Sequence, residues 1–209
     1  SKGSPQPGDG THQEKQPLPL ETTSIEAHFK RGSAYMEEYE FEKAHEEFNK
    51  VIALNPKHAE AYYQRGKARH HLDDEPDRAI KDFTRAIELN PNHAGAYYQR
   101  AWALNGENDL DGAIADYSQA LRLKPDATTY YNRGYVYFDK SEYDKAIEDY
   151  TQALNLEPND PLHYKQRGIA YLSLGKHDKA IKDFTQAINL KDGRLKAEAY
   201  YYRGNAHYA

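Results

Sequence analysis

A short motif returns six times along the chain and constrains its fold more than any other feature. It reads YYQRG at 62–66, YYQRA at 97–101, YYNRG at 130–134, YKQRG at 164–168 and YYYRG at 200–204, with a degenerate HFKRG at 28–32. Its arginines, called the motif arginines below, recur every 33 to 36 residues: Arg31, Arg65, Arg100, Arg133, Arg167 and Arg203. A period in this range is typical of proteins built from stacked repeats.

Each period contains two segments in which apolar and aromatic residues recur at helical spacing. In the second period these segments are AEAYYQRGKARHHL and DRAIKDFTRAIELNP. Polar and breaker residues at 73–77 (with Pro76), at 106–109 and at Gly175 predict the turns between them. Prolines at 56, 91, 125 and 158 follow the second segments and predict their ends, because proline disrupts a helix interior. Each unit is therefore predicted to be a pair of antiparallel helices.

Small and large residues alternate between the two helices of a unit in a fixed order. The motif ends in a small residue, called the motif glycine, which is Ala101 in the third unit. The second segments carry a small residue at Ala44, Ala79, Ala113, Ala146 and Ala180, and an aromatic four residues later at Phe48, Phe83, Tyr117, Tyr150 and Phe184. Small residues let two helices approach closely, and an aromatic ring fills the remaining space.

With these features, residues 25–209 resemble the tetratricopeptide repeat (TPR) family. The resemblance implies an all-α, right-handed superhelical solenoid of antiparallel helix pairs. It predicts repeats at 25–58, 59–93, 94–126, 127–160 and 161–196, and the first helix of a sixth, incomplete repeat at 197–209. Residues 1–24 are rich in proline and glycine and lack aromatics, which predicts a disordered leader or linker. The spacing of Thr23 and Glu26 predicts a helix start there.

The motif arginines stand where the family usually has leucine. A carboxylate recurs 16 or 17 residues later, at Glu47, Asp82, Asp116, Asp149 and Asp183. Arginine can bind a carboxylate through two parallel hydrogen bonds, so the pattern predicts an ion pair between the helices of each unit. The alternative is a ladder of arginines presented to an acidic ligand.

Composition excludes several classes of function. The net charge of -5 does not suit a phosphate-neutralising surface, so nucleic acid is not an expected partner. The chain has no cysteine, no apolar run of membrane-helix length and no phosphate-loop, HExxH or nucleophile motif. Adjacent His70 and His71 diverge on a helix, whereas His58 and His93 fall in loops. We therefore predict no catalytic residues, no metal site and no cofactor, and no direct insertion into a membrane.

The resemblance implies a concave groove lined by the first helices. The residues assigned to peptide binding on this basis are Phe29, Tyr63, Gln64, Lys67, Tyr98, Gln99, Trp102, Tyr131, Asn132, Tyr135, Phe138, Lys165, Gln166 and Ile169. For the aromatics at the second motif position, packing inside the fold is an equal alternative, and it stays open. The central amides Gln64, Gln99, Asn132 and Gln166 can both donate to and accept from a peptide backbone, unless they are simply solvated.

The predicted function is a non-catalytic scaffold that binds an extended peptide segment of a protein partner. Two alternatives stay open: a module that self-assembles through the terminal helix, end to end or as a dimer, and the repeat region of a larger enzyme such as a glycosyltransferase. Because the chain begins with Ser1, a targeting segment could precede it, and cytoplasmic, periplasmic and luminal locations all fit the sequence.

Overall fold

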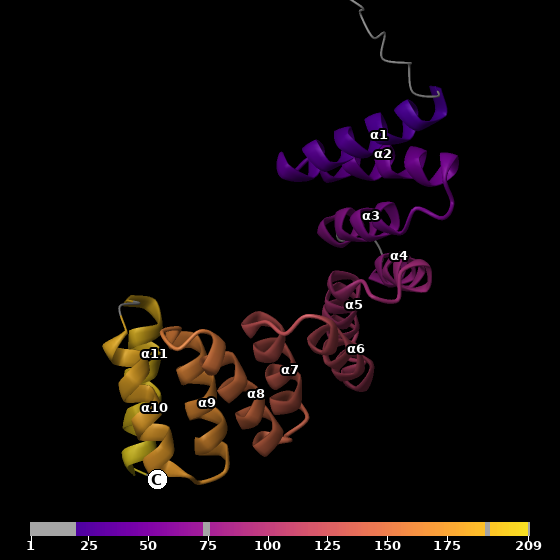
Figure 1. Cartoon of the computed structure of the whole chain (residues 1–209). Helices are drawn as coiled ribbons and strands as arrows, with labels where there is room; N and C mark the ends of the chain where they lie inside the picture. Colours follow the sequence, from indigo (N-terminus) through magenta and orange to yellow (C-terminus); the bar gives the residue numbers. More distant parts are fainter. Residues whose placement is uncertain (1–19, 73–75, 191–192, 209) are drawn as a thin grey trace, which may run out of the picture.

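The computed structural model describes residues 20–72, 76–190 and 193–208, and within these ranges the chain forms eleven α-helices and no strand (Figure 1). The helices stack in chain order into a curved solenoid, which confirms the predicted all-α class. They are α1 Leu20–Glu37, α2 Phe41–Leu54, α3 Ala59–His71, α4 Pro76–Leu89, α5 Ala94–Gly106, α6 Leu110–Leu123, α7 Ala127–Asp139, α8 Tyr143–Leu156, α9 Pro161–Ser173, α10 His177–Asn189 and α11 Gly193–Tyr208.

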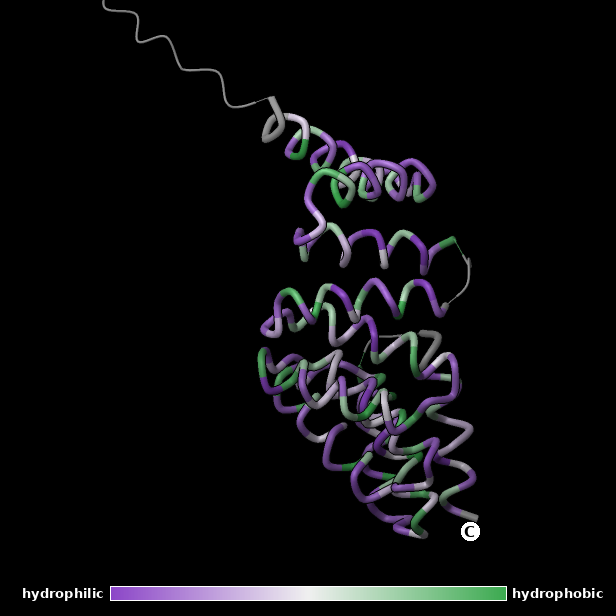
Figure 2. Tube along the Cα trace, turned by 90° about the vertical axis from the view of Figure 1, so that its right-hand side faces the viewer, coloured by the Kyte–Doolittle hydropathy of each residue, from purple (hydrophilic) through white to green (hydrophobic). Residues whose placement is uncertain are grey.

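The core is divided into a small cluster for each repeat. A Cβ atom added to Gly66 would lie 2.7 Å from a ring carbon of Phe83, and one added to Gly168 would lie 2.7 Å from Phe184. The aromatic ring of each second helix therefore fills the space beside the motif glycine. The alanines four residues before these rings are fully buried, so the two helices of a unit are in close contact. Hydrophilic and hydrophobic residues alternate along the helices, as expected for a series of small clusters (Figure 2).

Three helix starts differ from the sequence prediction. Helix α1 begins at Leu20, so residues 20–24, assigned to the leader, belong to the helix, and the start expected at Thr23 is wrong. Helix α4 begins at Pro76 rather than after it, because proline suits the first position of a helix, where its missing N–H would have no helical partner. Helix α11 begins at Gly193, before the expected boundary at 197. Residues 1–19 of the predicted leader lie outside the described ranges.

The turns inside four of the units each contain one residue with a positive φ angle. Tyr39, Asn108, Ser141 and Gly175 all have φ between 60° and 66°, in the left-handed region. Side chains also cap the starts of helices. Asp109 accepts from the N–H of Gly112 at the start of α6, and His93 Nδ1 accepts from the N–H of Ala96 at the start of α5. The loop histidines therefore act as helix caps. Among the described residues, no helix combines the length and the apolar character that crossing a membrane requires.

Candidate functional site

The motif arginines of the first five units form the predicted ion pairs. In the four central units each guanidinium binds its aspartate through two parallel hydrogen bonds; for Arg133 these are Nε to Asp149 Oδ2 at 2.8 Å and Nη2 to Oδ1 at 2.7 Å. The other three pairs are Arg65 with Asp82, Arg100 with Asp116 and Arg167 with Asp183. The aspartates are buried, so the arginines are not a ladder presented to an acidic ligand.

The same arginines also join neighbouring repeats, which the sequence reasoning missed. Arg133 Nη1 donates to Ser118 Oγ of the preceding repeat at 2.8 Å, and Ser118 Oγ in turn donates to the carbonyl of Ile114. Arg100 and Arg167 make the matching bonds to Thr84 and Thr151. Each central guanidinium also lies over the first tyrosine of its own motif, at Tyr62, Tyr97, Tyr130 and Tyr164. The recurring hydroxyl two residues after the carboxylate was the available sequence signal.

The aromatics at the second motif position pack inside the fold. Phe29 lies 5.6 Å from Phe48, and Tyr98 lies 5.7 Å from Tyr117, measured between ring centroids. Tyr63 and Tyr131 make the corresponding contacts with Phe83 and Tyr150. Burial raises the pKa of Tyr98, although a hydrogen bond to its hydroxyl acts in the opposite direction. Of the two alternatives that the sequence left open, packing is therefore the one that the structure supports for these residues.

The central amides are partly engaged inside the protein. Asn132 Nδ2 donates to the hydroxyl of Tyr98 at 2.8 Å, and Gln166 Nε2 donates to the hydroxyl of Tyr131 at 3.3 Å. Gln64 Nε2 donates to Glu60 Oε1 at 2.8 Å. Each of these three side-chain amides uses an N–H donor within the fold. Its side-chain carbonyl oxygen can still accept a hydrogen bond.

Trp102 and Tyr135 remain exposed, at 45% and 41% of their surface. Two pockets of about 210 Å³ each share Trp102 as a lining residue. One is lined by Trp102, Asn105, Tyr117, Tyr131, Asn132 and Tyr135, and the other by His70, His71, Tyr98, Gln99 and Trp102. His70 meets the indole at 4.2 Å, nearly perpendicular to it, whereas His71 stacks on Phe41. We call these two pockets together the Trp102 groove.

The other predicted binding residues have mixed surroundings. Lys67 lies over the ring of Tyr63, Phe138 packs against Tyr143, and Ile169 packs against the cluster around Phe184. Lys165 differs from its predicted role in peptide binding. Its side chain is buried and its ammonium pairs with Glu198 of α11 at 2.6 Å, so its charge is neutralised within the fold and does not face a peptide.

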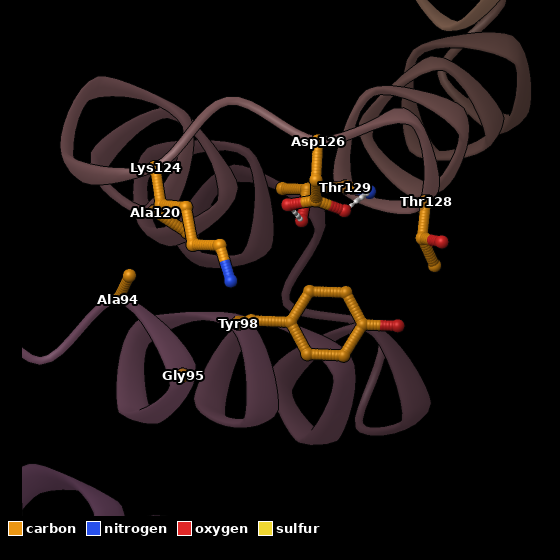
Figure 3. Close-up of a pocket in the computed structure, with 8 residues that line it drawn as sticks. All are labelled: Ala94, Gly95, Tyr98, Ala120, Lys124, Asp126, Thr128 and Thr129. Atoms are coloured by element: carbon orange, nitrogen blue, oxygen red, sulfur yellow. Dashed lines mark hydrogen bonds between the residues drawn. The ribbon is translucent and has the colours of Figure 1, made fainter. Parts of the chain in front are cut away.

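A third hollow, of about 370 Å³, lies where α5, α6 and α7 meet (Figure 3). The ring of Tyr98 forms one wall, and Lys124 and Asp126 lie across from it. Asp126 caps α7 by accepting from the N–H of Thr129 at 2.9 Å, so its carboxylate already has a structural role. The sequence did not indicate this hollow, because its walls come from three different helices.

In the part of the chain that the structure describes, one group combines carboxylates and a histidine closely enough to hold a metal ion. It consists of Glu157, Asp160 and His163. Each has a structural partner: Asp160 caps α9 through the N–H of Leu162, and His163 Nε2 lies 3.4 Å from Glu157 Oε2. The sequence reasoning did not single out this group.

Models described as tetratricopeptide repeat or TPR repeat match residues 32–73, 59–93, 83–115, 102–141, 127–160 and 161–192. These matches join into one continuous stretch, 32–192, that contains the four central Arg–Asp pairs and the Trp102 groove. The chain therefore belongs to the tetratricopeptide repeat family, as its motifs predict.

Solved structures of the same fold agree with this assignment. A crystal structure of MamA protein is 27% identical with a TM-score of 0.76, over 84% of this chain and 96% of that chain. MamA of Desulfovibrio magneticus RS-1 is 23% identical with a TM-score of 0.75, over 80% and 95% of the two chains. YrrB is 18% identical with a TM-score of 0.74, over 88% and 98%, a likeness of fold alone. A search among curated proteins finds no match. The fold and these neighbours support a protein-interaction scaffold.

Proposed function

We propose that the chain is a non-catalytic scaffold that binds an extended peptide segment of a protein partner in the Trp102 groove. The observation that carries the proposal is the pair of exposed rings, Trp102 and Tyr135, on two central helices whose other aromatics Tyr98 and Tyr131 pack inward. Large exposed aromatics at a pocket are typical anchors of protein interfaces. YrrB, which shares the fold, is described as a TPR protein with an unusual peptide-binding site.

The size of the pockets favours side chains over a free small molecule. Each pocket measures about 210 Å³, whereas sites for small ligands usually measure roughly 300 to 1,000 Å³. One apolar or proline side chain in each of the two pockets that share the indole therefore fits better than a cofactor. The aromatic walls supply apolar contact area, and the face of an indole can also hold a cationic group.

Amides at the groove can hold the peptide backbone. Asn105, Asn132 and Gln99 line the two pockets, so a donor and an acceptor are available beside the aromatic anchors. Such contacts bind the main chain without reading its sequence, and the two pockets then select the side chains. The net charge of -5 also favours a peptide over nucleic acid.

The chain has one tryptophan, which makes the test direct. Peptides selected from a random displayed library on the full chain are titrated while the emission of Trp102 is recorded. We expect the emission to shift on binding, because a peptide side chain replaces water beside the indole. In Tyr135→Ala the affinity should fall about thirtyfold, as is common for loss of an aromatic anchor.

Two matched variants complete the design. Lys67→Ala removes a charge from α3, the helix that supplies His70 and His71 to the groove, and should change the affinity by less than about threefold, mainly through its salt dependence. Trp102→Ala should abolish selection of the same peptides while circular dichroism stays helical. Peptides that bind Trp102→Ala and Tyr135→Ala as tightly as they bind the wild-type chain would show that the groove is not the binding site.

A further inference from the structure

Three of the four inward-packed aromatics at the second motif position are covered by a histidine of the next repeat. The pairs, with the distance between ring centroids, are Phe29 and His58 at 5.1 Å, Tyr63 and His93 at 4.5 Å, and Tyr131 and His163 at 5.4 Å. Each of these rings therefore packs between the aromatic of its own second helix and an imidazole.

Tyr98 is the exception, because no ring of the next repeat contacts it in the part of the chain that the structure describes. The residue that corresponds to His93 in the next repeat is Asp126, whose carboxylate caps α7. Gly95 widens the opening, since the preceding repeat has Glu60 at this place. Tyr98 therefore borders the hollow of about 370 Å³ in Figure 3, which we call the Tyr98 hollow.

The Tyr98 hollow adjoins the Trp102 groove along α5. Ala94, Gly95 and Tyr98 line the hollow, Tyr98 and Trp102 line one pocket of the groove, and Trp102 and Asn105 line the other. Four residues of an α-helix rise about 6 Å, and alternate side chains of an extended strand lie about 6.6 Å apart. A peptide that runs along α5 can thus place every second side chain in a successive pocket.

The walls of the Tyr98 hollow favour a neutral aromatic side chain. They carry one cation and one anion, Lys124 and Asp126, so a charged side chain of either sign would meet a like charge. Lys124 has no ion-pair partner among the described residues, and its ammonium extends toward Tyr98 across the hollow (Figure 3). An ammonium is attracted to the face of an aromatic ring. The hollow is also larger than either pocket of about 210 Å³ and therefore has room for a larger side chain.

We propose that the Tyr98 hollow binds an aromatic side chain of the partner peptide, two residues away from the side chain in the pocket lined by Tyr98 and Trp102. The inference rests on the proposed peptide binding in the Trp102 groove and specifies what the peptide carries there. The ligand ring packs on Tyr98 as His93 packs on Tyr63, with the ammonium of Lys124 beside it. The preferred peptide has one aromatic and two apolar residues at alternate positions.

Asp126→His is the variant that fills the hollow from within. It copies His93, which caps α5 through the N–H of Ala96 and covers Tyr63, so the fold should be kept. Asp126→Asn is the matched control, because its side-chain oxygen can still cap α7 while the hollow stays open. Tyr98→Leu is a second test variant, which removes the ring on which the ligand packs. Circular dichroism checks that all three stay helical.

The probes are peptides selected from a random displayed library on the full chain, each paired with a version whose aromatic residue is leucine. The change to leucine should weaken binding to the wild type and to Asp126→Asn by about fivefold, because ring stacking adds to apolar contact. In Asp126→His and Tyr98→Leu the two versions should bind equally. The aromatic peptide should also shift the methyl signals of Ala94 and Thr128 through its ring current, which the leucine version cannot do.

Two results would overturn the proposal. One is equal affinity of the aromatic and leucine peptides for the wild type. The other is a preference for the aromatic that persists in Asp126→His without methyl shifts, which would place the ring in another pocket. If the same peptides still need Trp102 and Tyr135, the peptide groove stands and only the aromatic subsite fails. If no selected peptide needs these two residues, the proposed function fails and the subsite fails with it.

Discussion

Arg167 of α9 and Arg203 of α11 occupy the same place in their repeats but have different surroundings. Both donate to a threonine of the preceding repeat and lie over the first tyrosine of their motif. Arg167 also holds a buried aspartate of its own second helix, whereas Arg203 pairs with no carboxylate among the residues that the structure describes. The first helix alone therefore supplies the link to the preceding repeat. The second helix supplies the buried charge and the ring that complete the unit.

The largest expected effect concerns a complete unit. Arg133→Leu leaves the buried carboxylate of Asp149 without its partner, so the free energy of unfolding should fall by about 3 to 5 kcal/mol in urea denaturation. Arg203→Leu is the matched control and should cost less than about 1 kcal/mol, since it strands no carboxylate. Equal losses in the two variants would contradict the comparison.

A double variant tests the ion pair itself. Burial is the largest influence on the pKa of Asp149 and raises it, while the hydrogen bond and the charge of Arg133 act to lower it. The pair should therefore be replaceable by apolar residues of similar size. Arg133→Leu combined with Asp149→Leu should recover most of the lost stability, and simple additivity of the two single losses would show that the residues are not coupled.

The next prediction compares two glycines. In Gly66→Ala the new methyl group would collide with the fully buried ring of Phe83, so stability should fall by about 1 to 3 kcal/mol. Gly204→Ala places the methyl group in open space and should stabilise the chain by up to about 1 kcal/mol, because alanine has the higher helix propensity. In thermal denaturation, Gly66→Ala should therefore unfold at a lower temperature than the wild-type chain, and Gly204→Ala at a higher one. A loss in Gly204→Ala would mean that the space beside Gly204 is already filled.

The smallest expected effect lies in the first unit, where the carboxylate is Glu47. Burial raises its pKa, but hydrogen bonds from Lys50, His28 and Arg31 outweigh this and lower it to about 2 from the ordinary 4.5. A lowered pKa stabilises the fold above pH 4.5, and this contribution is lost as the pH falls from 4.5 through 2. Glu47→Gln should therefore cost about 1 kcal/mol at pH 7, since two of the three partners are half exposed.

Unfolding curves of wild type and Glu47→Gln at several pH values check this prediction. The difference between them should be constant from pH 7 to 5 and should shrink toward pH 2. A difference that stays the same at low pH would show that the glutamate acts through packing instead of charge.

The amino-acid sequence by itself determines the repeat period, the helix pairs and the Arg–carboxylate pairs. These features depend on residues within one unit of about 34 residues, where small and aromatic residues stand at fixed spacing. The arginine and its carboxylate lie only 16 or 17 residues apart and on facing helices. The same spacing of arginine and carboxylate recurs in each of the first five units. It is therefore not a coincidence of one unit.

Only the tertiary structure decided which of the predicted binding residues face outward. Tyr98 is packed and accepts from Asn132 of the next repeat, and Lys165 is neutralised by Glu198, 33 residues away. Trp102 stays exposed and lines two pockets whose walls come from four helices. These outcomes depend on how one repeat stacks on the next, because a side chain on a first helix is covered or left open by its neighbours. The spacing within a single unit carries no record of that stacking.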